Sequence, residues 1–552
     1  MISLQSLSVQ SRWATWATLL ILPLLSSVVA LLLRNLAGPF WLWSNLDPDY
    51  FYLFDALHLV LREAPGHIPH PGIPLDTLGA VVLKLRHLGL DAQALTASVL
   101  ANPEAQLQAI SSVIIAINGL LLLLLGWAAL RASRSLVFAL LVQIAPLSSS
   151  LIVKNAFHVK PESLLIAGML LFMAAAVSGL KRETFDGNRY RLAILLGISG
   201  GLIGATKVTA LPILALPVLL LATPAALAIY GASLAVSLIL FTLPAFSVYP
   251  MIFEWLTKVL LASGPHGHGA ETVIDMGSYP AEIGRMLRRP PLTVALPLGL
   301  AGLAFATWRR RIGSPLPTPE VRLLAGTVLA QFLQAVVVAK QPGAQYMIPA
   351  FLLSAFTFGL VFRLAAAAVP LGSGYAAAVP ATGIFLTIAL TAGGLVSADH
   401  MRAELTGLRD NALRVDNDRF AACARVYFYS ASNPTFALYL AEHTTSVRLT
   451  DDKRWRPGFS AQLKQSRPAN EFWLDDWSTP NTFRLRDWEG ERSLADLTTQ
   501  YPCVMLRGGT GRVSGVTAYL AKTLPEAKFE TACSLPDEPT FTYRAGCDGV
   551  PR

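Results

Sequence analysis

The sequence predicts a mainly α-helical membrane protein: a polytopic helix bundle followed by a C-terminal α/β domain outside the membrane. The 552-residue chain is 53% hydrophobic and only 14% charged, whereas soluble domains carry roughly 25% charged residues. Apolar segments long enough to span a bilayer, which takes about 20 residues, recur between residues 13 and 396. The remaining residues, 397–552, are polar and hold all four cysteines.

Eleven segments are assigned as membrane spans. In order, they are Trp13–Leu33, Ile110–Leu130, Ser135–Val153, Ser163–Leu180, Tyr190–Lys207, Ala210–Ala222, Ala225–Val248, Leu292–Trp308, Val321–Val338, Met347–Leu364 and Tyr375–Val396. The sixth is short and rich in proline, so the count can differ by one or two. The first has no small-residue cleavage site and other spans follow it, which indicates a retained span and not a signal peptide.

Basic residues in the short loops predict the orientation, because Lys and Arg gather on the cytoplasmic side. With the N-terminus in the cytoplasm, four cytoplasmic loops carry such residues: Arg131 and Arg134; Lys181, Arg182, Arg189 and Arg191; Arg309, Arg310, Arg311 and Arg322; and Arg363. The net charge of +9 is then partly explained by the inner leaflet. It requires no nucleic acid, and we expect none as a partner.

Eleven spans from a cytoplasmic start place the C-terminal domain outside the membrane. Its cysteines are Cys423, Cys503, Cys533 and Cys547, and the bundle has none. An even number of cysteines in an extracytoplasmic domain predicts one or two disulfides. Four buried free thiols are the alternative, since cysteine is often buried.

The predicted domains are a transmembrane bundle, residues 1–396, and an extracytoplasmic domain, residues 397–552. The bundle includes a long first external loop, residues 34–109, in which Tyr50–Arg62 and Leu75–Leu88 have apolar residues at helical spacing. We expect these two segments to lie flat at the membrane interface as amphipathic helices.

The sequence of the C-terminal domain predicts a small α/β fold and contains no catalytic motif. The expected helices are Ala403–Val415 and Thr435–Glu442, and the expected strands are Arg425–Tyr429, Thr445–Leu449 and Cys503–Leu506.

Asp47 and Asp49 flank Pro48 at the head of the first external loop. Acids beside a bilayer are costly unless they have a function, and a carboxylate there can act as a general base. Asp47 followed by proline fits a helix N-cap, whereas Asp49 falls inside the first turn. We therefore favour Asp49 as the base and keep Asp47 as a candidate. The alternative is that both acids only favour a helix N-terminus.

His70 lies in a loop rich in proline and glycine and could bind an acid or a phosphate, or the loop could be a simple rigid turn. Its spacing from His67 and the aspartates matches no standard zinc motif.

Lysines in two further external loops are candidate phosphate ligands, since an ammonium is a compact cation. The first loop contains Lys154, His158 and Lys160, and the second contains Lys340 and Tyr346. Snorkelling of lysine at a helix end is the alternative explanation.

Lys207 is more unusual, because it lies between apolar residues where a span ends. It could face a cavity.

Together these motifs resemble the GT-C membrane glycosyltransferases, in the branch of the protein O-mannosyltransferases and aminoarabinose transferases. The family's loop acid falls on Asp47 or Asp49. Its His-Pro-Pro element appears as His70-Pro71-Gly72, and its late Lys-x-x-x-Arg-Tyr segment appears as Lys340 to Tyr346. The resemblance covers the bundle to about residue 364.

Two departures from the family pattern stand out. The two acids are separated by Pro48, and Gln345 replaces the arginine before Tyr346. The second departure weakens the case for a bidentate phosphate clamp.

The resemblance implies a hexosyl- or pentosyltransferase in the inner (plasma) membrane of a bacterium, with its C-terminal domain in the periplasm. The donor would be a polyprenyl-phosphate sugar held among membrane lipids, and the acceptor a lipid or glycan in preference to a protein. A monophosphate donor needs no metal, whereas a diphosphate donor would favour Mg²⁺ or Mn²⁺ on Asp47 and Asp49.

Two other functions remain open. A transporter or flippase of a lipid-linked saccharide would have ionisable residues inside the bundle and broken helices. A structural subunit would use its C-terminal domain to bind a partner.

Overall fold

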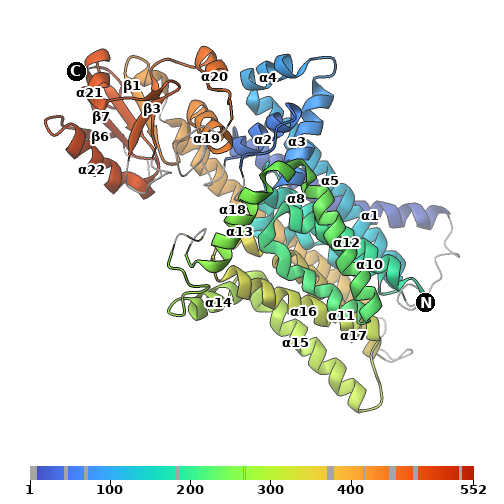
Figure 1. Ribbon diagram of the computed structural model, residues 1–552. Helices are drawn as coiled ribbons and strands as arrows, with labels where there is room; N and C mark the ends of the chain where they lie inside the picture. The colour runs from blue at the N-terminus through green and yellow to red at the C-terminus, as the bar shows by residue number, and fades with distance from the viewer. Residues whose placement is uncertain are drawn as a thin grey trace. The chain divides into compact units, whose positions relative to one another are not determined.

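The computed structural model describes residues 9–42, 48–67, 72–181, 187–264, 267, 269–369, 378–414, 417–446, 456–475, 483–533 and 538–551. Most of these residues are helical, and the strands come late in the chain (Figure 1). The packing divides the chain into two compact units. The first comprises Met1–Leu33, Ile68–Thr77 and Ser111–Met401, and the second comprises Arg34–His67, Leu78–Ile110 and Arg402–Arg552.

The first unit is all helical. Its α-helices are α1 (Val9–Ala37), α5 (Pro103–Ser133), α6 (Leu136–Gln143), α7 (Ser150–Asn155), α8 (Pro161–Ser178), α10 (Arg189–Thr206), α11 (Leu216–Leu221), α12 (Pro224–Thr242), α13 (Tyr249–Leu261), α14 (Tyr279–Leu287), α15 (Pro290–Arg311), α16 (Thr318–Val338), α17 (Ile348–Ala368) and α18 (Ala378–Arg414). Short 3₁₀ helices interrupt or join them: η2 (Ala145–Leu147), η3 (Val208–Ala215), η4 (Leu243–Val248) and η6 (Ala344–Met347). Helices α1, α5 and α18 continue into residues of the second unit.

Eight helical segments among the described residues are long and apolar enough to cross a membrane. They contain α1, α5, α8, α12 with α13, α15, α16, α17 and α18. The other three expected spans are also helical, as α6 with η2 and α7, as α10, and as η3 with α11. A multi-pass membrane fold is therefore confirmed, while the count of eleven and the orientation stay predictions.

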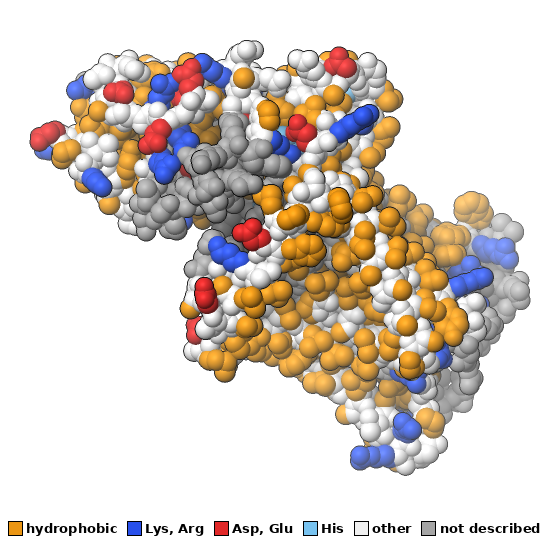
Figure 2. Space-filling view, in the orientation of Figure 1, with side chains coloured by type: hydrophobic (Ala, Val, Ile, Leu, Met, Phe, Trp, Pro, Cys, Tyr) orange, Lys and Arg blue, Asp and Glu red, His pale blue; other side chains and the backbone are white. Residues whose placement is uncertain are grey.

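Large apolar side chains on the outside of the helices agree with this assignment. Hydrophobic side chains cover much of the visible surface of the bundle (Figure 2). Ile239 and Leu240 on α12, and Leu300 on α15, are each more than half exposed. Contiguous apolar surface of this kind marks a membrane or protein interface.

Small residues bring α10 and α12 into close contact. A Cβ atom added at Gly197 or Gly201 of α10 would lie 2.5 Å from the Cβ of Ser233 or Ser237 of α12, respectively. Small residues four apart on two facing helices let their backbones approach, as in many membrane helix pairs. This packing fixes the axis of α10, and Lys207 directly follows the end of that helix.

The second unit combines helices with one seven-stranded sheet. Its helices are α2 (Tyr50–Val60), α3 (Ile73–Arg86), α4 (Ala92–Ala101), η7 (Asn417–Phe420), α19 (Pro434–Ser446), α20 (Ser460–Ser466), α21 (Leu494–Gln500), η8 (Thr510–Arg512) and α22 (Val513–Thr523), with the first residues of α3 belonging to the first unit. Its strands are β1 (Ala424–Phe428), β2 (Glu471–Asp475), β3 (Arg484–Asp487), β4 (Gly490–Glu491), β5 (Val504–Arg507), β6 (Glu530–Cys533) and β7 (Thr540–Tyr543). The order is β4-β3-β2-β1-β5-β7-β6, and β1 runs parallel to both β2 and β5.

The two faces of this sheet differ in chemistry. Because side chains alternate along a strand, Val426 and Phe428 of β1 join an apolar core with Leu474 of β2. The opposite face carries polar and aromatic residues that are nonetheless buried, among them Trp473 and Arg507.

A disulfide joins Cys423 to Cys503, which lie next to the neighbouring strands β1 and β5. Cys547 is also disulfide-bonded. The described residues include no free cysteine, so the prediction of disulfides in this domain is confirmed.

Most expected elements of the C-terminal domain are present. The strands near residues 425 and 503, and the helix near residue 435, are confirmed as β1, β5 and α19. The expected helix near residue 403 is the last part of α18. The expected strand Thr445–Leu449 is wrong at its start, because α19 continues through Ser446; residues 447–449 lie outside the described residues.

In the first loop, the helices predicted at residues 50 and 75 are confirmed as α2 and α3, whereas α4 was not anticipated. Nearly every residue of α2 is buried, so the expected amphipathic surface helix is wrong. A helix that is apolar on all sides belongs in a core. The structure also groups residues 34–67 and 78–110 with the C-terminal residues, whereas the sequence analysis grouped them with the bundle. The predicted domain boundary after residue 396 stays a prediction.

Candidate active site

The predicted site residues are distributed over both units. Asp49 belongs to the second unit, and the first unit contains Lys154, His158, Lys160, Lys340 and Tyr346. Asp47 and His70 lie outside the described residues.

Lys207 forms the centre of a charged cluster in the first unit. Its side chain is 2% exposed, its Nζ donates to Oε1 of Glu162, and it lies 5.0 Å from the ring centroid of Tyr346. A desolvated ammonium over a tyrosine ring gains cation–π attraction. The backbone favours both charges, because Lys207 follows the C-terminus of α10 and Glu162 lies in the first turn of α8.

Lys160 and His158 precede Glu162 on the same connection between α7 and α8. Both are buried, with 2% and 7% exposure. Lys160 occupies the position before α8, and the ring of His158 stacks on Phe157 with centroids 4.5 Å apart. The Oγ of Ser111 donates to the carbonyl of Phe157 at 2.5 Å and ties this connection to α5. Two buried cationic or titratable groups therefore lie within four residues of Glu162. Lys154 is half-buried in the last turn of α7.

A hydrogen bond to its carbonyl oxygen holds the backbone of Tyr346. The Nε2 of Gln334 donates to the carbonyl oxygens of Tyr346 and Thr209, both at 2.7 Å. One side chain of α16 thus connects η6, which carries Tyr346, to η3, which begins just after Lys207. The same side chain therefore holds the backbone that carries Tyr346 and the backbone two residues after Lys207.

Lys340 has a different environment, although it is only six residues from Tyr346. Its Nζ donates to the carbonyl of Leu260 at 2.5 Å, at the end of α13. Desolvation lowers the pKa of Lys340 below its ordinary value. Of Lys340 and Lys207, Lys207 is the one with a described contact to the Tyr346 ring.

Asp49 directly precedes α2 in the second unit. It is 2% exposed, its backbone is helical (φ −57°, ψ −21°), and its side chain makes no capping hydrogen bond. The expectation that Asp49 lies inside the first turn is wrong, because α2 begins at Tyr50 and Asp49 occupies the N-cap position. The capping role expected of Asp47 stays a prediction.

The neighbour of Asp49, Tyr50, donates from its hydroxyl to Oε1 of Glu104 at 2.8 Å. Burial raises the pKa of Tyr50 well above its ordinary value, and the charges of Glu104 and Asp49 raise it further. Tyr50 is therefore a neutral hydrogen-bond donor between two carboxylates.

Residues from the C-terminal part of the chain hold the helix that follows Asp49. Phe459 packs against Phe54, with ring centroids 5.4 Å apart, and stacks on His58 at 4.9 Å. The guanidinium of Arg456 donates to the carbonyl oxygens of Thr445 and Ala64. This packing joins segments almost 400 residues apart in the sequence.

Asp55, also on α2, bonds the backbone of the loop that follows this helix. Its carboxylate accepts from the backbone N–H groups of Gly66, at 2.6 Å, and His67, at 3.1 Å. Arg456 approaches Asp55 to 3.9 Å. The segment before residues 68–71, which contain the expected His-Pro element, is therefore anchored.

No group of three or more potential metal ligands occurs among the described residues. Asp47 is not among them, so Mg²⁺ or Mn²⁺ binding by Asp47 and Asp49 stays a prediction.

Sequence reasoning noticed Lys207 but did not assign it to the site, and it missed Glu162 as its partner. The available signal was Pro161-Glu162 at a helix start, where an acid is favoured.

Comparison with known proteins identifies a similar fold but no sequence family. No protein-family model matches the chain, and no curated protein matches it. The structure is similar to the crystal structure of apo ArnT from Cupriavidus metallidurans, with a TM-score of 0.51 and 13% identity, over 99% of this chain and 100% of that chain. The structure of the same protein bound to undecaprenyl phosphate gives a TM-score of 0.49 and 13% identity, over 94% and 97% of the two chains. ArnT is an aminoarabinose transferase with the GT-C fold. The GT-C-like fold expected from the sequence is thus confirmed.

Proposed function

We propose that this protein is an integral-membrane glycosyltransferase that uses a polyprenyl-phosphate-linked sugar. The observation that carries the proposal is the buried Lys207–Glu162 pair beneath Tyr346, inside a chain with the ArnT-like fold. Ionisable groups in a membrane bundle are expensive and usually functional. A transferase needs such a cation where the phosphate leaves.

Lys207 is suited to a phosphate because an ammonium has three donors and no fixed geometry. Lys160 and His158 would assist from the neighbouring connection. Lys340 and Lys154 are further candidate phosphate contacts in this proposal. His70 would hydrogen-bond the acid or the phosphate, and Tyr346 would position Lys207.

The chemical step forms a bond between the anomeric carbon and an acceptor oxygen. It breaks the bond between that carbon and the phosphate oxygen, and the lipid phosphate leaves with the electron pair. Asp49, or Asp47, would take the proton of the acceptor hydroxyl. With a monophosphate leaving group the lysines supply the positive charge, and a diphosphate donor would add Mg²⁺ or Mn²⁺. The acceptor would be a lipid or glycan at the outer face of the bacterial inner membrane.

A transporter or flippase of a lipid-linked saccharide is the second candidate. One observation favours it: the buried ion pair lies in a bundle whose helices are interrupted by 3₁₀ segments, as at η3 beside Lys207. Transporters place ionisable groups next to broken helices. Such a protein would move the lipid-linked sugar without breaking a glycosidic bond.

Sugar transfer by the purified protein separates the two candidates. A panel of polyprenyl-phosphate sugars would be incubated with wild type, Asp49→Asn and Asp47→Asn. Asp91→Asn is the matched control, because Asp91 is exposed and its carboxylate only caps α4. We expect one of the first two variants to lose about 10²–10⁴-fold in rate while still binding donor. No turnover of any donor, with both variants complementing a knockout, would instead support transport.

A further inference from the structure

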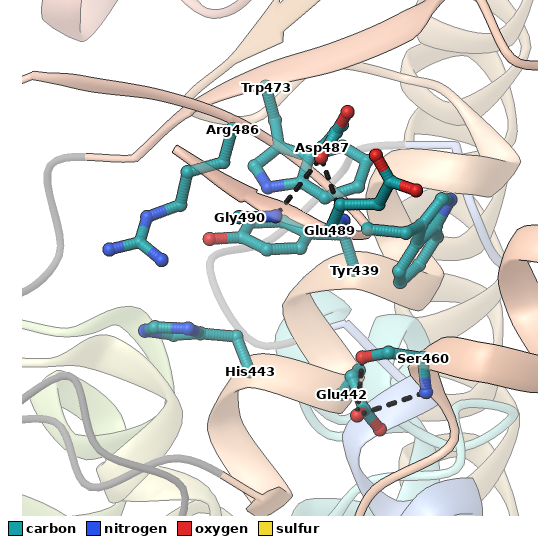
Figure 3. Close-up of a pocket in the computed structure, with 10 residues that line it drawn as sticks. Tyr439, Glu442, His443, Ser460, Trp473, Arg486, Asp487, Glu489 and Gly490 are labelled. Atoms are coloured by element: carbon teal, nitrogen blue, oxygen red, sulfur yellow. Dashed lines mark hydrogen bonds between the residues drawn. The ribbon is translucent and has the colours of Figure 1, made fainter. Parts of the chain in front are cut away.

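The C-terminal domain contains a cavity whose lining includes none of the proposed catalytic or phosphate-binding residues. It has a volume of about 160 Å³ and is lined by residues of α19, β2, the β3–β4 hairpin and the start of α20 (Figure 3). One enclosed water needs only roughly 10–15 Å³, whereas drug-sized ligands occupy pockets of roughly 300–1,000 Å³. The cavity therefore accommodates one small ring and not a lipid chain.

Three aromatic side chains form one wall of the cavity. Tyr439 stacks on Trp473 with centroids 4.1 Å apart, and Trp473 meets Trp488 edge-on at 4.8 Å. Tyr439 and Trp473 are buried, and Trp488 is half-buried on the hairpin. The edge contact places the Trp488 indole against Trp473 in the absence of a ligand. A preorganised aromatic face loses little entropy on binding.

The carboxylates around the cavity already have partners. Glu442 accepts from the backbone N–H of Phe459, at 2.9 Å, and from the hydroxyl of Ser460, also at 2.9 Å. Asp487 accepts from the backbone N–H groups of Glu489, at 2.7 Å, and Gly490, at 3.1 Å.

Ion pairs offset most of the remaining charge. Glu489 pairs with Lys464 and Arg492, and Arg492 also pairs with Asp487. Arg486 and His443, which both lie on the left of Figure 3, approach the carboxylate of Asp475 to 3.7 Å and 3.8 Å, respectively. With acids and bases in near balance, the cavity does not select a strongly charged group such as a phosphate.

The cavity nevertheless offers hydrogen-bonding groups beside the aromatic wall. Arg486, His443 and Ser460 line it. A ligand that fits these features is neutral, has an apolar face for the indole and has hydroxyl oxygens around its edge.

We propose that this cavity binds a single sugar ring of a glycan. The C–H groups on one face of a pyranose or furanose pack against the negative face of an aromatic ring, and its hydroxyls meet the surrounding donors and acceptors. On the proposed transferase function, the ring belongs to the acceptor glycan, and the C-terminal domain holds the acceptor without taking part in the chemical step.

Direct binding tests the cavity without any donor. Full-length protein in detergent would be mixed with methyl glycosides of glucose, galactose, N-acetylglucosamine and arabinose, and saturation-transfer NMR would detect contact with the ring protons. We expect a dissociation constant of about 1 mM for at least one glycoside. Trp488→Ala should weaken binding about tenfold or more, and Trp488→Phe should restore part of it because the aromatic face returns. Trp308→Ala is the control, since Trp308 is an exposed tryptophan on α15.

Wild-type protein that shows no saturation transfer with any glycoside up to about 50 mM contradicts the proposal. Equal binding by wild type and Trp488→Ala also contradicts it. If Trp488→Ala does not fold, the wild-type measurement and Trp488→Phe still decide the question. In transfer assays, Trp488→Ala should raise the acceptor KM and leave the donor KM unchanged. Glycoside binding without sugar transfer would overturn the proposed enzyme and leave the cavity assignment intact.

Discussion

Lys207 in the bundle and Arg507 in the C-terminal sheet are both fully buried cations paired with a buried glutamate. Lys207 pairs with Glu162, and Arg507 donates from its Nε to Glu538 at 2.9 Å. The surroundings differ. Arg507 also donates to the carbonyl of Ala412 at 2.7 Å, and Glu538 accepts from the backbone N–H of Ser432 at 3.0 Å. Lys207 instead faces a tyrosine ring at the end of a helix.

This difference shows why a buried ion pair alone does not reveal function. The planar guanidinium of Arg507 has donors in fixed directions, and the Arg507–Glu538 pair braces two further chain segments through the backbone groups of Ala412 and Ser432. The ammonium of Lys207 is a point charge that can turn toward a new anion. We therefore assign Arg507 to stability and Lys207 to the donor phosphate.

Arg507→Met should give the largest effect. Removing one partner of a buried pair leaves Glu538 as an uncompensated charge, which costs about 3–5 kcal/mol. We expect the C-terminal domain to unfold at a much lower denaturant concentration, as followed by tryptophan fluorescence in detergent. A change of under about 1 kcal/mol, the range of an exposed pair, would mean that the Arg507–Glu538 pair is not a brace.

Removing both members of each pair should separate stability from function. Replacing a buried pair by apolar residues often costs little, so Lys207→Met/Glu162→Met and Arg507→Met/Glu538→Met should both recover most of the stability lost in single variants. Only the first should lose sugar transfer, by about 10²–10³-fold. Thermal unfolding and the transfer rate, measured on the same preparations, check both statements. Equal transfer rates in the two double variants would contradict the view that the Lys207–Glu162 pair serves sugar transfer and the Arg507–Glu538 pair serves stability.

Lys207→Arg tests whether positive charge alone is sufficient. An arginine retains the charge, but its planar fork differs from a rotatable ammonium. We expect transfer to fall about tenfold, equivalent to ~1.4 kcal/mol in the barrier, with little change in thermal unfolding. Full activity in this variant would show that the site requires a positive charge but not the geometry of an ammonium group.

The smallest expected effect concerns pH. The hydrogen bond between Nδ1 of His58 and Oε2 of Glu63, 2.8 Å apart, lowers the pKa of Glu63 below its ordinary value, and the charges of His58 and Arg456 lower it further. Because the folded-state pKa is lowered, the stability from this group is present above about pH 4.5 and is lost as pH falls through the folded value. Glu63 is 39% exposed, so the contribution should stay below about 1 kcal/mol. Glu63→Gln should flatten this part of the unfolding profile, and an unchanged acid limb would contradict the assignment.

Sequence periodicity was sufficient for the membrane-spanning helices and for the class of fold, but it missed α4 and most strands of the C-terminal sheet. Apolar runs gave helices at every expected span, and β-branched and aromatic residues gave β1 and β5. The contacts between buried side chains could not be predicted from the sequence. Lys207 and Glu162 are 45 residues apart, on separate helices, and no local pattern pairs them.

The burial of α2 shows the same limit. Its apolar residues suit a core as well as a membrane surface, and only the packing of Phe459 against Phe54 and His58 decides between them. Likewise, β2 was not among the predicted strands. The sequence analysis also contained no signal that the polar face of the sheet is covered and lines an aromatic cavity.

Binding of a polyprenyl phosphate tests most directly the claim that Lys207 holds the donor phosphate. The affinities of wild type, Lys207→Met/Glu162→Met and Arg507→Met/Glu538→Met for this lipid would be compared in detergent. We predict that the first double variant binds about tenfold or more weakly and that the second binds like wild type. Equal affinity in all three proteins would contradict the account and place the phosphate elsewhere in the molecule.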